Sequence, residues 1–96
     1  MIVYLTAMVK SSAGNSELLK SYLLELVQHS TKEKACLQYD LHQSSEDENL
    51  FVFQEAWASQ ADLDFHNSQP YLKAFGEKAA TILDGGITIY KTKKIS

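Results

Sequence analysis

Apolar residues recur along the chain with two different spacings, which predict alternating strands and helices. Residues Ile2–Lys10 are apolar, β-branched or aromatic at most positions and predict a strand with apolar side chains on both faces. Residues Cys36–Gln43 alternate between apolar and polar side chains, which predicts a half-buried strand with Leu37 on its apolar face and Cys36 on its polar face. Two further segments have strand character: Leu50–Trp57 and Ile87–Thr92.

The segment between the first two strands has the spacing of an amphipathic helix. Apolar side chains between Leu18 and Val27 repeat at intervals of four residues and form one stripe. Asn15 or Ser16 can cap the first turn, and the helix is expected to end near Thr31.

The segment before the last strand predicts two helices. Ser59 and Asp62 form a pattern similar to a capping box, so a short helix is expected to begin there and to end near Asn67. Pro70 is favourable in the first turn of a second helix, and the glycine pair Gly85–Gly86 is expected to terminate it.

The order of these elements is β-α-β-β-α-β, with the second helical region split in two. This order predicts an α+β, ferredoxin-like fold, with an antiparallel four-stranded sheet and helices on one face. With 96 residues, the chain is expected to form a single domain over residues 1–96.

The uncovered face of this sheet is expected to be too apolar for a monomer. The first strand is apolar on both faces, and so is Leu50–Trp57, where Phe51, Phe53 and Trp57 lie opposite Leu50 and Val52. Burying one large apolar side chain contributes about 1.5–3 kcal/mol, so leaving several exposed is unfavourable. A homodimer with two sheets stacked face to face removes this exposure. The alternative is that the open face binds a ligand in a monomer.

Composition excludes several classes of protein and site. The formal net charge of −3 argues against nucleic-acid binding, since the lysines near the C-terminus form only a small cluster. The single cysteine, Cys36, rules out an internal disulfide, and His29 and His42 lie too far apart in sequence to suggest a metal site. No apolar run suggests a membrane span or a signal peptide, so the cytoplasm is the expected location.

Several residues together resemble one known family. The chain combines the βαββαβ order with Glu55 and Trp57 at a strand end, His66 eleven residues after Glu55, and Pro70 followed by Leu72-Lys73-Ala74-Phe75. In these features it resembles the antibiotic biosynthesis monooxygenase family. The resemblance implies a dimeric α+β barrel. For some members it implies cofactor-free oxygenation of phenols, quinols or related aromatics, and for others processing of a furanone-type signalling molecule or haem degradation.

The chain departs from the family pattern at two positions, and the haem-degrading branch resembles it poorly. Many relatives place a second histidine where this chain has Tyr71, so the resemblance does not imply a two-histidine site here. Relatives often carry Pro-Gly before the second strand, where this chain has Lys34-Ala35. The haem-degrading branch uses an asparagine on the first strand, and Ile2–Lys10 contains none.

His66 is the candidate catalytic residue. Its imidazole can accept a proton near neutral pH, and a phenolic substrate must lose a proton before it can reduce oxygen. The alternative is a structural histidine at a helix end. Candidate substrate-binding residues are aromatic side chains that suit a flat ring, together with one carboxyl: Phe51, Phe53, Glu55, Trp57, Tyr71 and Phe75. The alternatives for these are plain core packing and, for Glu55, a structural hydrogen bond.

The sequence therefore predicts a cofactor-independent monooxygenase acting on a small aromatic or quinol-type substrate with O2. No phosphate loop, dinucleotide glycine motif or Ser/His/Asp arrangement is present. The absence of such motifs fits a cofactor-free enzyme and fits a protein without catalytic activity equally well. The alternatives are an isomerase or degrading enzyme for a signalling molecule on the same scaffold, and a non-catalytic dimeric ligand-binding module.

Overall fold

The computed structural model describes all 96 residues, Met1–Ser96. Its elements are β1 (Val3–Lys10), α1 (Ser16–Ser30), β2 (Cys36–Gln43), β3 (Leu50–Trp57), α2 (Gln60–Asn67), α3 (Pro70–Ala79) and β4 (Thr88–Thr92). The strands form one sheet in the order β2-β3-β1-β4, with every neighbouring pair antiparallel. The predicted α+β, ferredoxin-like fold is confirmed. None of the helices combines the length and apolar character needed to cross a bilayer.

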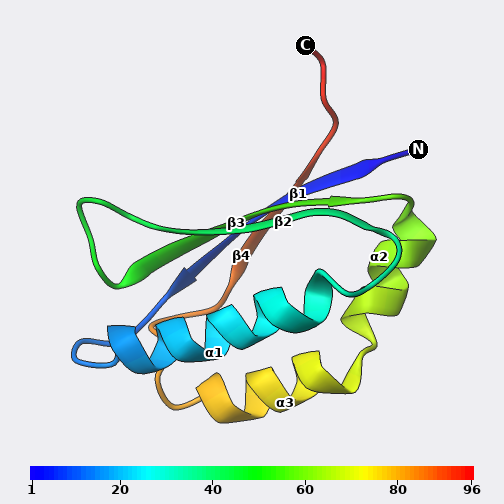
Figure 1. The fold of residues 1–96 in the computed structure, drawn as a ribbon. Coiled ribbons are helices and arrows are strands. Elements are labelled where there is room, and N and C mark those ends of the chain that lie inside the picture. The colour runs from blue at the N-terminus through cyan, green and yellow to red at the C-terminus, as the bar shows by residue number, and fades with distance from the viewer.

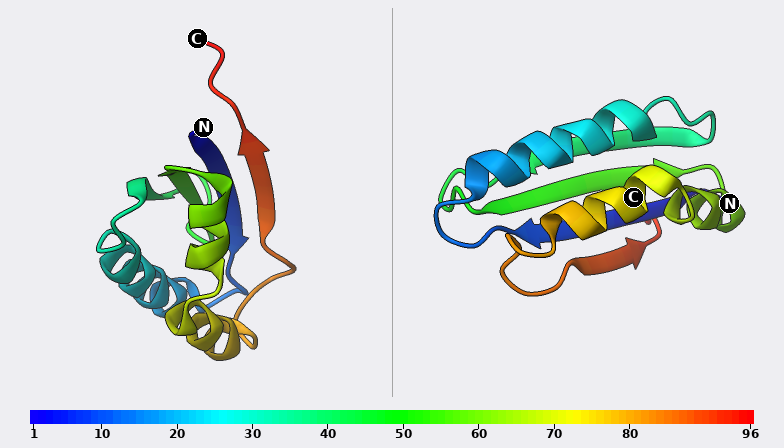
Figure 2. Two further views of the ribbon diagram at one scale, coloured as in Figure 1. Left: turned by 90° about the vertical axis from the view of Figure 1, so that its right-hand side faces the viewer. Right: turned by 90° about the horizontal axis from the view of Figure 1, so that it is seen from below.

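All three helices lie on one face of the sheet (Figures 1 and 2). The core forms between them, where side chains from β1 and β3 meet the apolar stripe of α1. Leu19 and Leu23 of α1 are fully buried, as predicted from their spacing, and Phe51 and Phe53 of β3 are almost completely buried against the same layer. The aromatic face of β3 therefore belongs to the helix side of the sheet.

Helix α2 stands at one end of the two layers, where α1 ends and α3 begins (Figure 1). The predicted cap is present, because the Ser59 hydroxyl accepts a hydrogen bond from the backbone N–H of Asp62. Leu63 and His66, three residues apart, are the buried residues of α2. The sequence pattern thus turns His66 toward the interior.

Helix α3 is shorter than predicted, since it ends at Ala79 and not at the glycine pair. The following residues leave the helix because the end of β1 supplies other partners for their backbone groups. The Asp84 N–H donates to the carbonyl of Lys10, and Leu83 forms an isolated antiparallel bridge with Ser11. Gly85 has a positive φ of 80° and turns the chain toward β4.

Strand β2 departs from the expected alternation at its first residues. A register irregularity between Cys36 and Gln38 pairs Cys36 with Trp57, so Cys36 packs against the core, while Leu37 is 54% exposed. The faces predicted for Cys36 and Leu37 were therefore wrong, because one extra residue reverses a two-residue period. At α1, Asn15 takes the capping position but its side chain makes no capping hydrogen bond.

Candidate functional site

A cavity of about 330 Å³ lies between the sheet and the helices. Twelve of its sixteen lining residues are hydrophobic, and they come from β1, α1, β3, α3 and the β4 region. Its polar side chains are those of Glu55, His66 and Asn67. Ile87 and Ile89 also line the cavity and are 42% and 57% exposed, so the cavity opens beside β4, the edge strand that no helix covers (Figure 2).

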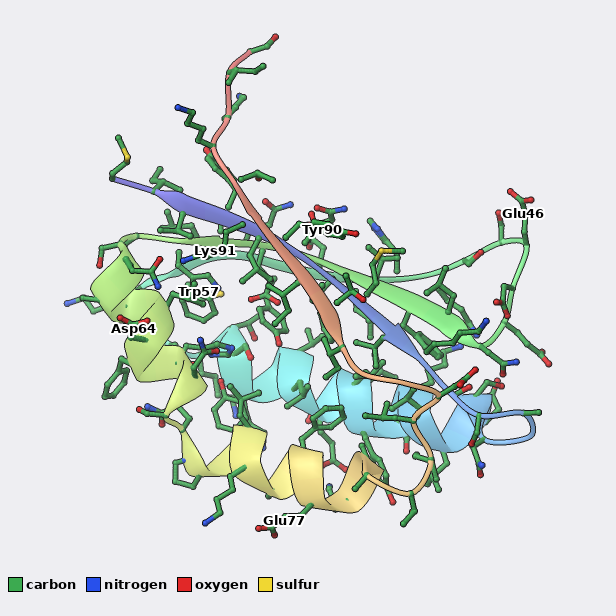
Figure 3. The ribbon with its side chains drawn as sticks, turned by 180° about the vertical axis from the view of Figure 1, so that it is seen from behind. Glu46, Trp57, Asp64, Glu77, Tyr90 and Lys91 are labelled. Atoms are coloured by element: carbon green, nitrogen blue, oxygen red, sulfur yellow. The ribbon has the colours of Figure 1, made fainter.

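His66 lies in the last turn of α2 with only 4% of its side chain exposed. Its ring packs on Trp57, with 4.2 Å between ring centroids, and meets Tyr39 edge-on at 5.7 Å. Figure 3 shows Trp57 beside α2, between the sheet and the helical layer. Aromatic contacts on two sides thus fix the plane of the imidazole, and the end of α2 favours a positive charge there.

One nitrogen of His66 is held by the protein, and the other is free. Nδ1 lies 2.6 Å from Oε2 of Glu33 and 3.1 Å from the hydroxyl oxygen of Tyr71. No protein group is hydrogen-bonded to Nε2, yet no buried side-chain nitrogen or oxygen lacks a partner. Since His66 lines the cavity, Nε2 is the nitrogen that is accessible from it.

Glu55 is the second titratable group of the cavity. It is 7% exposed, and its Oε1 accepts a hydrogen bond of 2.9 Å from Nε1 of Trp57. Burial raises the pKa of Glu55 to about 7, and the hydrogen bond from Trp57 partly opposes this rise. Near neutral pH this carboxyl can therefore either donate or accept a proton.

Comparison with known proteins shows where this arrangement belongs. A family model described as antibiotic biosynthesis monooxygenase matches residues 2–78. The chain belongs to the antibiotic biosynthesis monooxygenase family. It is 32% identical over 92 residues to "Putative monooxygenase YcnE" of Bacillus subtilis, an alignment that covers 96% of this chain and 97% of that protein.

Solved structures have the same fold. The crystal structure of PA3566 from Pseudomonas aeruginosa superposes with a TM-score of 0.94 at 30% identity, covering 99% of this chain and 95% of that one. Rv0793 from Mycobacterium tuberculosis superposes with a TM-score of 0.92, covering 100% of this chain and 97% of that one. At 19% identity the second likeness concerns the fold alone.

The structure divides the sequence-predicted site residues of this family member into two groups. Four of them line the cavity: Phe53, Glu55, His66 and Phe75. The other three lie outside its lining: Phe51, Trp57 and Tyr71. Phe51 is 1% exposed and belongs to the core, while Trp57 supports His66 from below. Tyr71, where many relatives are expected to have a second histidine, contacts His66 on its Nδ1 side.

Sequence reasoning missed Glu33 and the aliphatic walls of the cavity. Glu33 lies in the polar turn between α1 and β2, where a carboxylate is normally solvated, so neither periodicity nor a motif marked it. Only the tertiary fold brings it to His66, 33 residues further along the chain. The β1 side chains were assigned to a strand face, but nothing in their spacing indicated empty space beside them.

Proposed function

We propose that this protein is a cofactor-independent monooxygenase that oxidises a small aromatic hydroxyl compound or quinol with O2. Family membership supports oxygenase chemistry. The observation that carries the proposal is the position of His66, an imidazole with one free nitrogen in the wall of an otherwise apolar cavity. Such a group can remove the proton of a bound hydroxyl.

The size and polarity of the cavity support a small, uncharged substrate. About 330 Å³ is at the lower end of the range of about 300–1,000 Å³ for ligand pockets. The aromatic faces of Tyr39, Phe53 and Phe75 suit a flat ring. No lysine lines the cavity and the chain contains no arginine, so an anionic substrate would find no counter-charge there.

The proposed reaction begins with proton transfer from the substrate hydroxyl to Nε2 of His66. The resulting anion is electron-rich and reduces O2 by one-electron steps. One oxygen atom then joins a ring carbon, and the other leaves as water. The substrate itself supplies all the electrons, as in the conversion of a ring CH2 to C=O by one O2 with release of one water. Protonated Glu55 can donate a hydrogen bond to the developing oxyanion.

The test is O2 uptake with a panel of quinols and phenols, with products identified by mass spectrometry. Replacing His66 by alanine should lower turnover by about 10²–10⁴-fold, as expected for loss of a general base. Asp64→Ala, on the exposed side of the same helix, is the matched control and should leave turnover unchanged. Turnover in His66→Ala equal to that of the wild type would exclude His66 as the base.

Proton-transfer isomerisation is the second candidate function. Two titratable groups, His66 and Glu55, line one cavity, and the pKa of Glu55 is raised to about 7. One of them could remove a proton from a substrate carbon while the other returns a proton elsewhere. Product formation that continues without O2 would favour isomerisation, whereas stoichiometric O2 consumption excludes it.

The proposal includes a homodimer formed through the open sheet face. Tyr4, Met8 and Val52 lie on this face, only partly buried, and no helix covers them (Figure 2). Sedimentation at micromolar concentration should give twice 10.8 kDa. Val52→Asp should shift the protein toward monomer, and Glu17→Lys on the helix side should not. A wild-type mass of 10.8 kDa contradicts the dimer.

A further inference from the structure

Four polar side chains from four parts of the chain meet behind His66. Glu33 comes from the turn after α1, His66 from the end of α2, Tyr71 from the start of α3 and Ser30 from the end of α1. The Tyr71 hydroxyl donates to Oε2 of Glu33 at 2.5 Å, and the same oxygen lies 2.6 Å from Nδ1 of His66. The hydroxyls of Ser30 and Tyr71 are 3.1 Å apart.

The hydrogen atoms in this cluster can be placed by counting donors and acceptors. A carboxylate has only acceptor atoms, so each partner of Glu33 must bring a hydrogen. The Tyr71 hydroxyl keeps its proton, because burial and the Glu33 carboxylate both raise the pKa of Tyr71. Nδ1 of His66 must then carry the second hydrogen, and in a neutral ring Nε2 is left with a lone pair.

We propose that Glu33 is a positioning residue that holds neutral His66 in its Nδ1–H tautomer, so that the basic Nε2 faces the cavity. Tyr71 and Ser30 hold the carboxylate in place from the opposite side. The inference rests on the proposed function only in that it assigns Nε2 as the base. Tyr71 thereby supports the site from behind and does not replace a second histidine inside the cavity.

Two features make this arrangement effective for a base. Free imidazole favours the Nε2–H tautomer, which would turn an N–H toward the substrate, and a charge-assisted hydrogen bond to Glu33 reverses that preference. When Nε2 takes a proton, the ring becomes a cation between Glu33, on the Nδ1 side, and the face of Trp57, 4.2 Å away between centroids. Both neighbours stabilise the charged ring relative to the neutral one.

A purely structural role for Glu33 predicts a different result. If the carboxylate only ties the turn to α2 and α3, its loss should change stability and leave the tautomer of His66 as it was. The Glu33 side chain is 15% exposed, so Glu33→Ala leaves no deeply buried unpaired carboxylate behind. Far-UV circular dichroism checks that this variant keeps its helices.

The deciding measurement is the tautomer of His66, read from the imidazole ¹⁵N chemical shifts at a pH where the ring is neutral. His66→Ala assigns the signals among the three histidines. We expect an Nδ1–H ring in the wild type, an Nε2–H ring in Glu33→Ala, and retention of the Nδ1–H form in Tyr71→Phe, which keeps the carboxylate. An Nε2–H ring in the wild type, or an unchanged tautomer in Glu33→Ala, overturns the proposal.

Turnover with an active quinol supplies a second arm. Glu33→Ala should lower kcat by more than tenfold with little change in KM, because substrate contacts are kept while the base is misdirected. Glu33→Gln, whose side-chain oxygen can still accept from Nδ1, should recover part of the rate. Absence of turnover in every variant counts against the proposed function, and the tautomer measurement still decides the role of Glu33.

Discussion

Replacing Glu55 by glutamine should remove the pH dependence that this buried carboxyl gives to folding. Burial raises its pKa from 4.5 to about 7, so below pH 4.5 it is protonated in both the folded and the unfolded chain. As the pH rises from 4.5 to about 7, the unfolded chain ionises while the folded chain stays protonated, and the free energy of unfolding falls. Above about pH 7 both forms are ionised and the loss is complete.

The size of this loss follows from the difference between the two pKa values. Each pKa unit corresponds to about 1.4 kcal/mol, so raising the pKa of Glu55 to about 7 destabilises the fold by roughly 3 kcal/mol at alkaline pH. Glutamine has no charge to desolvate, and its side-chain oxygen can still accept the hydrogen bond from Trp57. At alkaline pH the variant should therefore be more stable than the wild type, by up to roughly 3 kcal/mol.

The assay is urea unfolding at a series of pH values and a fixed protomer concentration. Trp57, the single tryptophan, reports unfolding by its fluorescence. Glu46→Gln, an exposed carboxyl in the β2–β3 loop, is the control and should follow the wild-type curve (Figure 3). Parallel curves for Glu55→Gln and the wild type, or a variant that is less stable at every pH, would refute the reasoning.

Three further predictions concern stability and use the same unfolding assay. Leu23→Ala removes a fully buried side chain and should cost about 2–5 kcal/mol, whereas Leu24→Ala, 47% exposed, should stay within about 0.5 kcal/mol; equal effects would contradict the packing. Ser59→Ala should cost about 1 kcal/mol through loss of the cap on α2, and no change would show the cap to be unimportant. Gly85→Ala should cost more than Gly86→Ala, because only Gly85 has a positive φ.

The fold could be predicted because each element carries its own local pattern. The stripe that includes Leu19 and Leu23, the cap at Ser59 and the proline at the start of α3 each fix one element independently of the others. Four strands and their connections then leave few arrangements for the sheet. His66 was within reach of the same reasoning, since a titratable ring on the apolar side of a short helix is unusual.

The details that the sequence did not reveal all depend on contacts between distant segments. Helix α3 ends early because the backbone near Leu83 pairs with the end of β1, about 70 residues away in sequence. The irregularity at Cys36 depends on its pairing with Trp57. Glu33 reaches His66 through the packing of three helices and a turn. Local periodicity contains no information about such contacts.

The two glutamates near His66 take different roles because their surroundings differ. Glu55 lies in an apolar cavity with one hydrogen-bond donor, Trp57, so burial dominates and its pKa rises toward neutrality. Glu33 accepts hydrogen bonds from both Tyr71 and His66, so its negative charge is directed at the imidazole. A small domain has little stability to spare for buried polar groups, which makes their gathering at one end of the sheet an argument for function. On the proposed function, Glu55 acts on the substrate and Glu33 acts on the base.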